Sequence, residues 1–432
     1  MDDPGDLSAD GIDLADHRFW DRPPVERARA FATLRRERPV AWFGNLNWFE
    51  DDPAGPPVPV EFAPTAGFWA VTRMAEVAEV SRHPEIYLSG PGAVSILDLP
   101  PEMVEYFAGM ISTDNPRHAR LRRIVSQAFS PRMIRRIEDH IAEVARRVVE
   151  GVGPRGHCDF VTEVAAPLPL EVICQMMGVP ADRFGDAFRC STIILSNGDP
   201  EYVPAGTHPV TAIVEAGAEL TAMMEEIAAA RMTEPTGDLT SALVHGNIDG
   251  ESLSHAELAS FFILLLTAGN ETTRNAIAHG LLALTEHAHA RADWQSDVDH
   301  VTPTAVDEIV RWASPVIWMR RTLATGATLG GQALQAGDKL LLIYASANRD
   351  ETVFDAPERF DVRRSPNPHV GFGAPGPHFC LGAHLARREI GALFTELFAR
   401  VPDIAAAGEP DRLRSSFVNG IKHLECRFTP VG

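Results

Sequence analysis

One long helix constrains the fold of this chain more than any other feature of the sequence. Ser254 and Glu257 form an S-x-x-E capping box directly before the apolar run Phe261 to Leu266, a pattern that marks a helix start. No proline follows before Pro303. If the helix runs to about His287 it covers about thirty residues, roughly 50 Å at 1.5 Å per residue. Such a helix crosses a whole domain and predicts a fold built around it.

The remaining sequence predicts a mainly α fold with small β-sheets. Apolar residues recur at helical spacing from Ala119 to Val152 and from Glu163 to Met177, whereas Lys339 to Tyr344 is strand-like. Asn419-Gly420 predicts a two-residue hairpin. No repeat or change of composition marks a linker, so we predict a single domain over 1–432. Within it, residues 1–66 form a peripheral N-terminal segment with a loop-like insert at Asp51 to Pro64. The shorter predicted elements are helices at Val25 to Arg38 and Met74 to Ser81 and a strand at Phe68 to Thr72.

Composition excludes several classes of function. The chain carries 39 basic and 59 acidic residues, and its net charge of −20 opposes a general attraction to nucleic acid or anionic lipid. Its five cysteines are odd in number and widely spaced, and the first residues contain no secretory signal, so a cytoplasmic location is predicted. No apolar stretch approaches the roughly 20 residues of a membrane span, so no membrane anchor is predicted.

Cys380 is the strongest candidate for chemistry. It follows a loop rich in glycine and proline within 367–389, NPHVGFGAPGPHFCLGAHLARRE, and precedes a predicted amphipathic helix from Leu381 to Phe398. A helix N-terminus should lower the pKa of the thiol, and the glycines on either side leave room for a large flat ligand. These features favour a haem thiolate. A buried structural cysteine, or a zinc site shared with His378 and His384, is the alternative on these residues alone.

Three motifs in order make the chain resemble a known family. The run around Cys380, the segment AGNETT at 268–273 and EIVR at 308–311 together resemble a bacterial cytochrome P450, from about Trp69 to the C-terminus. The resemblance implies the P450 fold and haem b, iron protoporphyrin IX, as cofactor. HVGFG, LRSSFVNGIKH and one extra residue between Phe372 and Cys380 are most similar to actinobacterial P450s that oxidise sterols and branched lipids.

The resemblance also implies which residues contact the haem. His118 and Arg122 stand four residues apart on one helical face, and two propionates in an apolar slot require buried cations. Arg320 rivals Arg321 because the adjacent arginines leave the register open, and each arginine could instead belong to a surface ion pair. The implied iron ligand is Cys380, and the other implied cofactor contacts are His118, Arg122, Ala268, Arg321, Phe372, His378 and Gly382.

A threonine of the long helix is the implied catalytic residue. Helical spacing puts Thr272 on the same face as an apolar wall. Without the other motifs, the more common role of a mid-helix threonine is to donate a hydrogen bond to the carbonyl four residues back. The resemblance implies instead that Glu271 and Thr272 relay protons toward O₂. It also implies an apolar substrate pocket, for which the candidates are Ile96, Leu97, Leu265, Val316, Ile317, Trp318, Met319, Phe417 and Val418.

A second charged motif has an implied structural role. Glu308 and Arg311 stand three residues apart, which alone is a common exposed helix pair. The resemblance implies instead a buried triad with Arg359 of the PERF segment, supporting the loop before Cys380.

The implied activity is that of a monooxygenase. It would insert one oxygen atom from O₂ into a C–H bond of a hydrophobic small molecule of sterol, lipid, terpene or polyketide type. Electrons would come from a separate ferredoxin-type partner, steered by a positive patch. A peroxide-driven haem-thiolate oxidase and a non-catalytic haem-binding sensor are the alternatives. The residues expected in the patch are Arg123, Arg387 and Arg388.

Overall fold

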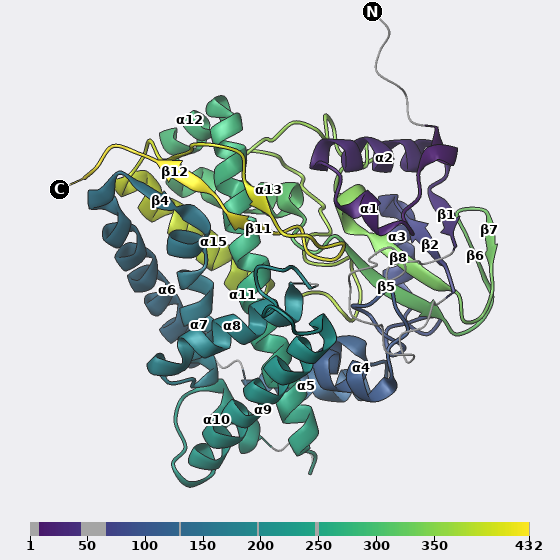
Figure 1. The fold of residues 1–432 in the computed structure, drawn as a ribbon, viewed down its shortest axis with the longest axis horizontal. Helices are drawn as coiled ribbons and strands as arrows, with labels where there is room; N and C mark the ends of the chain where they lie inside the picture. The colour runs from purple at the N-terminus through teal and green to yellow at the C-terminus, as the bar shows by residue number, and fades with distance from the viewer. Residues whose placement is uncertain (1–7, 45–65, 129–130, 197, 247–249, 432) are drawn as a thin grey trace, which may run out of the picture.

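The computed structural model describes residues 8–44, 66–128, 131–196, 198–246 and 250–431. These stretches form a mainly α structure with small sheets, as predicted (Figure 1). The largest sheet lies on one side of the molecule beside α2 (Pro24–Glu37) and α3 (Met74–Arg82), and most helices gather on the other. The insert predicted at Asp51 to Pro64 lies outside the described residues. Within the described stretches, every helix is too short or too polar to traverse a bilayer.

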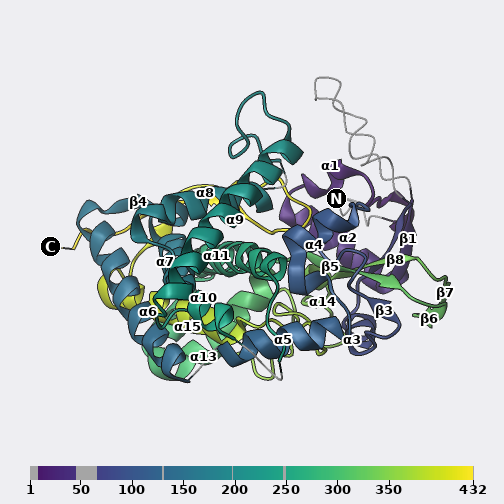
Figure 2. The same ribbon diagram turned by 90° about the horizontal axis from the view of Figure 1, so that it is seen from below.

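The predicted long helix is α11 (His255–Glu286). Ser254 is its N-cap, both hydrogen bonds of the capping box with Glu257 are present, and His287 is its C-cap, so both predicted ends are correct. Most of the helix is buried, and it runs through the centre of the other helices (Figure 2). It packs against α4 (Pro101–Ala108), α7 (Pro167–Met177), α8 (Phe184–Leu195), α9 (Pro209–Thr233) and α13 (Val298–Ala313).

Prolines divide the two longer stretches that were predicted as continuous helix. Pro131 occupies the first turn of a new helix, and Pro167 does the same after a π-helical turn at Val161–Ala165. Proline lacks an N–H and is best tolerated in the first turn of a helix, where that N–H has no partner within the helix, and each of these two prolines lies at a helix start. The remaining helices are α1 (His17–Trp20), α5 (Arg117–Ala128), α6 (Pro131–Val152), α10 (Leu239–Val244), α12 (Ala288–Ser296), α14 (Tyr344–Ala347) and α15 (Ala383–Arg400).

The largest sheet has five strands in the order β1-β2-β8-β5-β3. Its central strand β8 lies within the strand-like run predicted at Lys339 to Tyr344 and is buried throughout. β2 and β8 are parallel, and the other pairs are antiparallel. The N-terminal segment contributes the edge strand β1 and so forms part of the sheet. The strands are β1 (Val40–Phe43), β2 (Phe68–Val71), β3 (Tyr87–Leu88), β5 (Trp318–Leu323) and β8 (Lys339–Ile343).

The smaller sheets have two or three strands each, and the β6–β7 hairpin projects at the edge of the molecule (Figure 1). The β6–β7 hairpin turns at Gly330-Gly331, where both residues have positive φ. Such a turn suits glycine because it has no Cβ. The strands are β4 (His157–Asp159), β6 (Ala327–Leu329), β7 (Gln332–Leu334), β9 (Ala405–Ala406), β10 (Asp411–Arg412), β11 (Ile421–His423) and β12 (Glu425–Arg427).

The two-residue hairpin predicted at Asn419-Gly420 is wrong. A type I′ turn needs positive φ at both central residues, and neither Asn419 nor Gly420 has it. The Asn419 side chain instead donates to the carbonyl of Ala313 at 2.7 Å, and its backbone N–H donates to Pro315 at 2.9 Å. The pair therefore attaches this loop to the end of α13.

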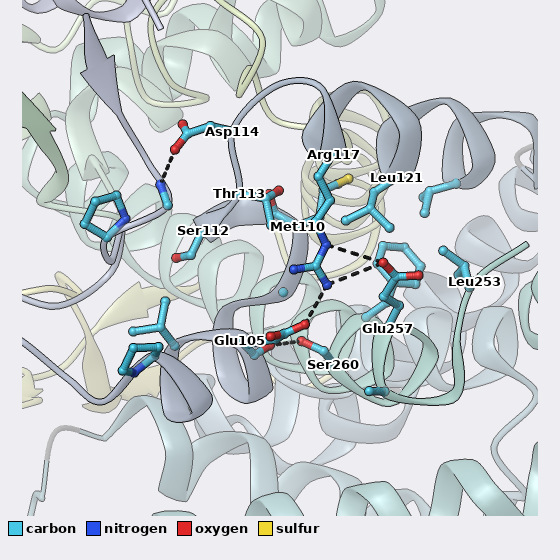
Figure 3. A pocket seen from close by; sticks show the side chains of 18 of the residues that line it. Glu105, Met110, Ser112, Thr113, Asp114, Arg117, Leu121, Leu253, Glu257 and Ser260 are labelled. Carbon is cyan, nitrogen blue, oxygen red and sulfur yellow. Dashed lines mark hydrogen bonds and ion pairs between the residues drawn. The ribbon is translucent and has the colours of Figure 1, made fainter. Parts of the chain in front are cut away.

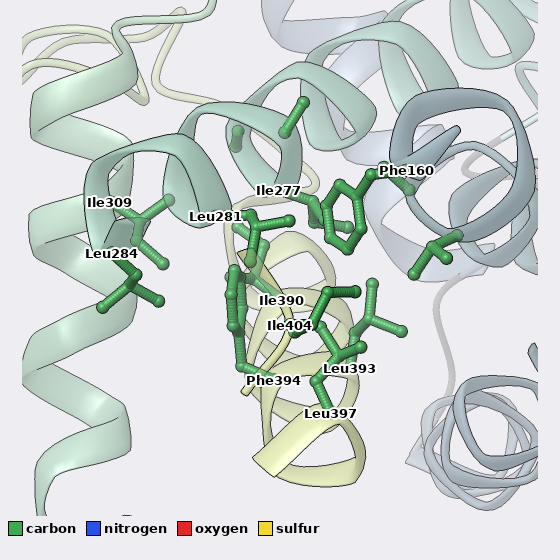
Figure 4. Packing of buried hydrophobic residues seen from close by; sticks show 14 of the residues in the cluster. Phe160, Ile277, Leu281, Leu284, Ile309, Ile390, Leu393, Phe394, Leu397 and Ile404 are labelled. Atoms are coloured by element: carbon green, nitrogen blue, oxygen red, sulfur yellow. The ribbon is translucent and has the colours of Figure 1, made fainter. Parts of the chain in front are cut away.

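Core packing fixes α15 against α11. Ile390 and Phe394 of α15 meet Leu281 of α11 and Ile309 of α13, and all four side chains are buried (Figure 4). Gly280 permits this close approach, because a Cβ there would lie 2.8 Å from Ile309 and 3.0 Å from Phe394. The loop that ends at Cys380 leads directly into α15, so the same packing positions that loop relative to α11.

Candidate active site

A cavity of about 240 Å³ lies between α11, the start of α15 and β5. We call it the active-site cavity. Its walls bring together residues far apart in the sequence, including every residue predicted to contact the cofactor. The predicted site residues that line it are His118, Arg122, Leu265, Ala268, Thr272, Val316, Met319, Arg321, Phe372, His378, Cys380 and Gly382.

The loop before Cys380 closes on Phe372. The backbone N–H of Cys380 donates to the carbonyl of Phe372 at 3.0 Å, and Gly373 adopts a φ of 85°, which glycine tolerates. The extra residue in this loop therefore leaves the Phe372 ring in the cavity wall. The guanidinium of Arg387 lies 4.4 Å from the centroid of that ring, a cation–π contact that orients it.

The prediction of a lowered pKa for Cys380 is wrong. The thiol is exposed to the cavity, but the surrounding protein desolvates it and raises its pKa. The N–H groups of Gly382 and Ala383 and the nearby Arg122 and Arg387 act in the opposite direction without overcoming desolvation. A cation coordinated to the sulfur would supply the compensating positive charge that a thiolate needs at this desolvated position.

Nothing in the described structure supports a zinc site at Cys380. The group of three possible ligands found among the described residues is Glu201, Asp411 and His423, which does not include this thiol. The other cysteines are buried free thiols.

Four basic side chains converge on one side of the active-site cavity. The rings of His118 and His378 lie 4.1 Å apart, and Arg122 and Arg321 line the same cavity. Burial, reinforced by Arg321, His118 and Arg122, lowers the pKa of His378 to about 2, and burial also lowers the pKa of His118 and of Arg321. Among the described residues neither arginine has a carboxylate within ion-pair distance. This uncompensated group fits a ligand with two carboxylates, such as haem.

Strand alternation separates the adjacent arginines of β5. Met319 and Arg321 face the active-site cavity. Arg320 points to the opposite face, where it pairs with Asp98 at 2.8 Å and donates to the carbonyls of Ser95 and Leu97, both at 3.2 Å. Successive strand residues face opposite sides, so only one of the two can face the cavity. That residue is Arg321.

Thr272 and Glu271 lie in different environments. The Thr272 hydroxyl is open to the cavity and donates to the carbonyl of Ala268 at 2.8 Å, the bond common for a mid-helix threonine. Glu271 is only 2% exposed and does not line the cavity. Its carboxylate is paired with Arg274 and accepts from Asn275 at 3.0 Å. Consecutive helix residues point about 100° apart, which explains the separation.

Glu389 is a cavity residue that the sequence analysis missed. It lies on α15, is 2% exposed and lines the active-site cavity together with Thr273. Burial raises its pKa to about 8, against a smaller opposite effect of hydrogen bonding with Thr273. The signal in the sequence is its spacing, because Glu389 stands four residues from both Leu385 and Leu393 and so shares their buried helix face.

The predicted triad contains a different arginine. Glu308 is fully buried and accepts from Arg311 at 2.7 and 2.8 Å and from Arg364 at 3.1 and 3.3 Å. Arg359 was predicted as the third member, but its side chain is 64% exposed and pairs with Asp361 at 2.7 Å. Only its carbonyl takes part, accepting from Arg311 and Arg364. The motif indicated the right segment and the wrong side chain.

Six predicted pocket residues lie outside the active-site cavity. Ile317 and Val418 are buried, 2% and 1% exposed, and Ile317 donates to the carbonyl of Phe417 at 2.8 Å. The other four line a separate cavity of about 300 Å³ beside α1, which we call the N-terminal cavity: Ile96, Leu97, Trp318 and Phe417.

The three arginines predicted to form a positive docking patch are each paired with an acid. Arg123 pairs with Glu251 at 3.3 Å, Arg387 with Asp307 at 2.7 Å, and Arg388 with Glu138 at 3.1 Å. Their charges are therefore largely neutralised locally, contrary to the expectation of a free positive patch.

Comparison with known proteins identifies the family. The profile described as Cytochrome P450 matches residues 212–401. The chain is 47% identical over 424 residues to a methyl-branched lipid omega-hydroxylase of Mycobacterium tuberculosis, covering 98% of this chain and 95% of the relative. The chain belongs to the cytochrome P450 family. This P450 is also 38% identical to a steroid C26-monooxygenase of Mycolicibacterium smegmatis, over 95% of this chain and 92% of that protein.

A solved structure agrees with the fold. A Mycobacterium marinum cytochrome P450 in complex with pseudoionone is 42% identical and superposes with a TM-score of 0.89, covering 96% of this chain and 98% of that one. The predicted family, fold and haem cofactor are confirmed, and the protein is a monooxygenase. The named activities of these relatives do not favour the sensor alternative.

Proposed function

We propose that this P450 hydroxylates a C–H bond at or near the end of a branched aliphatic chain on a lipid-like substrate. The observation that carries the proposal is the apolar wall of the active-site cavity, which includes Phe261, Leu264 and Leu265 on the α11 face that also carries Thr272. Apolar walls with few polar groups bind apolar chains. The names of the relatives, a methyl-branched lipid omega-hydroxylase and a steroid C26-monooxygenase, support the same substrate class.

The residues of the cavity suit haem binding. Cys380 would ligate the iron, and His118, Arg122, Arg321 and His378 would hold the two propionates by charge-assisted hydrogen bonds. When bound, the haem would activate O₂, using two electrons delivered by the redox partner. The carboxylates would in turn offset the cost of holding four basic groups together in a poorly solvated space.

The chain itself would deliver protons. The Thr272 hydroxyl donates to Ala268 and leaves its lone pairs free to accept from a water in the cavity. Glu271 remains a predicted member of this relay, but its carboxylate would have to leave Arg274 and Asn275 to reach that water. Glu389 lines the cavity already and, with a pKa of about 8, is largely protonated at neutral pH. It is therefore the better-placed proton donor.

A separate ferredoxin-type protein is the proposed electron source, and the cytoplasm is the proposed location. Free, buried thiols in the described structure support a reducing compartment. Turnover with a surrogate ferredoxin and reductase should give product, and peroxide alone should give little. The reverse result would favour the peroxide-driven oxidase.

The substrate class is tested by spectral binding titrations of the holoprotein, followed by product analysis. The panel should contain iso-branched fatty acids, straight-chain fatty acids, steroids with branched side chains, terpenes and a macrolide. We expect the tightest binding for a branched chain, and a terminal alcohol as product. Tight binding of the macrolide with no lipid turnover would overturn the proposal.

A further inference from the structure

A third cavity, of about 360 Å³, adjoins the active-site cavity (Figure 3). It lies between α4, the start of α5 and the start of α11, and we call it the α4 cavity. Met110 and Phe261 line both the α4 cavity and the active-site cavity, so these two side chains stand between them. Among the described residues, none lines both the N-terminal cavity and the active-site cavity. The α4 cavity is therefore the more direct extension of the active-site space.

The α4 cavity has an apolar part and a charged rim. Leu121, Val125 and Leu253 supply apolar wall, and the rim carries Glu105 and Arg117. Figure 3 shows the Arg117 guanidinium between the carboxylates of Glu105 and Glu257. An apolar space that ends at a half-exposed cation complements a fatty acid: the apolar wall would contact the chain, and the cation would face the carboxylate.

The two carboxylates on Arg117 are held very differently. Glu257 is only 10% exposed, is 3.0 Å from Arg120 and accepts from the Ser254 N–H at 3.0 Å. Glu105 is 53% exposed, and among the described residues Arg117, at 2.6 Å, is its one ion-pair partner. An exposed carboxylate loses little by returning to water. Glu105 can therefore be exchanged for another carboxylate, whereas Glu257 is fixed.

A long chain needs this additional space. The active-site cavity must accommodate the haem together with the reacting end of the chain. A chain whose terminal carbon reaches the Cys380 side must extend into a neighbouring cavity. Met110 lies at the junction, and methionine adapts its shape readily because it is unbranched.

We propose that the α4 cavity binds the carboxylate end of a long-chain fatty acid substrate, and that Arg117 binds this carboxylate in place of Glu105. The inference rests on the proposed lipid substrate and goes beyond it by assigning a site for the polar end. Burial of the apolar chain would hold the carboxylate near the rim and raise its effective concentration there above that of an unattached anion.

The test compares isopalmitic acid with its methyl ester on the holoprotein, because the two probes have the same branched chain and the ester lacks the negative charge, at the cost of one added methyl group. Dissociation constants come from the change in the Soret band on titration. Arg117→Gln should weaken binding of the acid about tenfold and binding of the ester less than about twofold. Glu105→Gln should tighten binding of the acid about threefold, because it removes the competing carboxylate, and should leave the ester unchanged.

A matched control lies at the other cavity. Arg414 lines the N-terminal cavity and pairs with Asp21 at 2.9 Å, which is the same kind of exposed ion pair. Arg414→Gln should change neither dissociation constant. Arg117→Lys keeps the charge and should restore most of the affinity for the acid. This rescue separates recognition of the carboxylate from a general effect on the folding of α4.

Four results would overturn the inference. Equal weakening of acid and ester by Arg117→Gln would make Arg117 a structural residue only. No effect of that variant, or a selective effect of Arg414→Gln, would exclude the α4 cavity as the site of the carboxylate. If neither probe binds the wild type while the macrolide does and no lipid is turned over, the proposed lipid substrate fails, and the inference fails with it. If the probes bind but Arg117→Gln does not weaken binding of the acid selectively, only the inference is refuted, and the proposed substrate class stands.

Discussion

Replacement of Arg364 by glutamine should destabilise the protein strongly, although no sequence motif marks this residue. Its side chain is 7% exposed and makes two contacts with the fully buried Glu308. It also donates to the carbonyls of Asp355 at 2.7 Å, Ala356 at 3.2 Å and Arg359 at 2.9 Å. Removal of one partner from a buried ion-pair network costs about 3–5 kcal/mol, because the remaining groups stay buried without compensation.

Arg359→Gln is the matched control. The Arg359 side chain is 64% exposed, and its pair with Asp361 is of the surface kind, which contributes at most about 1 kcal/mol. At roughly 2.1 cal/mol/K per residue, unfolding a chain of this length has an entropy near 0.9 kcal/mol/K, so each kcal/mol corresponds to about 1 °C. We therefore expect a fall in Tm of about 3–5 °C for Arg364→Gln and of less than about 1 °C for Arg359→Gln.

The assay follows thermal unfolding of the holoprotein by circular dichroism and, in parallel, loss of the thiolate-type carbonyl spectrum. The second signal reports the Cys380 loop, which the Glu308 network is expected to support. It should therefore be lost at a lower temperature in Arg364→Gln. If Arg359→Gln lowered the Tm as much as Arg364→Gln, the assignment of the third arginine would be incorrect.

Thr272→Ala should retain haem but divert several-fold more reducing equivalents into peroxide, measured as the ratio of peroxide to product. The control Thr267→Ala removes a buried hydroxyl that is bonded to the backbone, and it should leave this ratio unchanged. Glu389 has its pKa raised from 4.5 to about 8 by burial, so the native state binds more protons between these values and loses stability as pH rises through them. Glu389→Gln should remove that loss; parallel pH profiles of Tm in the two proteins would contradict this. Arg321→Gln should speed haem transfer to apomyoglobin about tenfold, and Arg320→Gln should not; equal rates would show that neither arginine is specific for the cofactor.

Local signals in the sequence were sufficient to predict the structure where the interacting residues are neighbours in the chain. Ser254 and Glu257 fix the start of α11 by bonds within one helical turn, and the predicted bounds are correct for that reason. Asn419 shows the opposite case. Its partner Ala313 is 106 residues away, and a local turn preference of the Asn-Gly pair is overridden by that contact.

The candidate site was predictable to the extent that a motif specifies a position. The motifs indicated Cys380 and Thr272, and both line the active-site cavity. They did not decide between Arg320 and Arg321, because the choice depends on which face of β5 is turned inward. Desolvation raises the pKa of both Cys380 and Glu389. It depends on how the folded chain surrounds each group and has no local signature in the sequence.

The capping box at the start of α11 has a consequence for which amino acids this position can accept. Glu257 accepts the N–H of Ser254 and also faces the guanidinium groups of Arg117 and Arg120. Aspartate is one methylene too short to reach back to the cap. Glutamine could still accept the N–H but would remove the carboxylate that both arginines share, leaving Arg117 with Glu105 and Arg120 with Glu251. Glutamate alone meets the two requirements in full, so among folded holoprotein variants recovered after random mutagenesis of this codon, glutamate should be enriched over aspartate and glutamine.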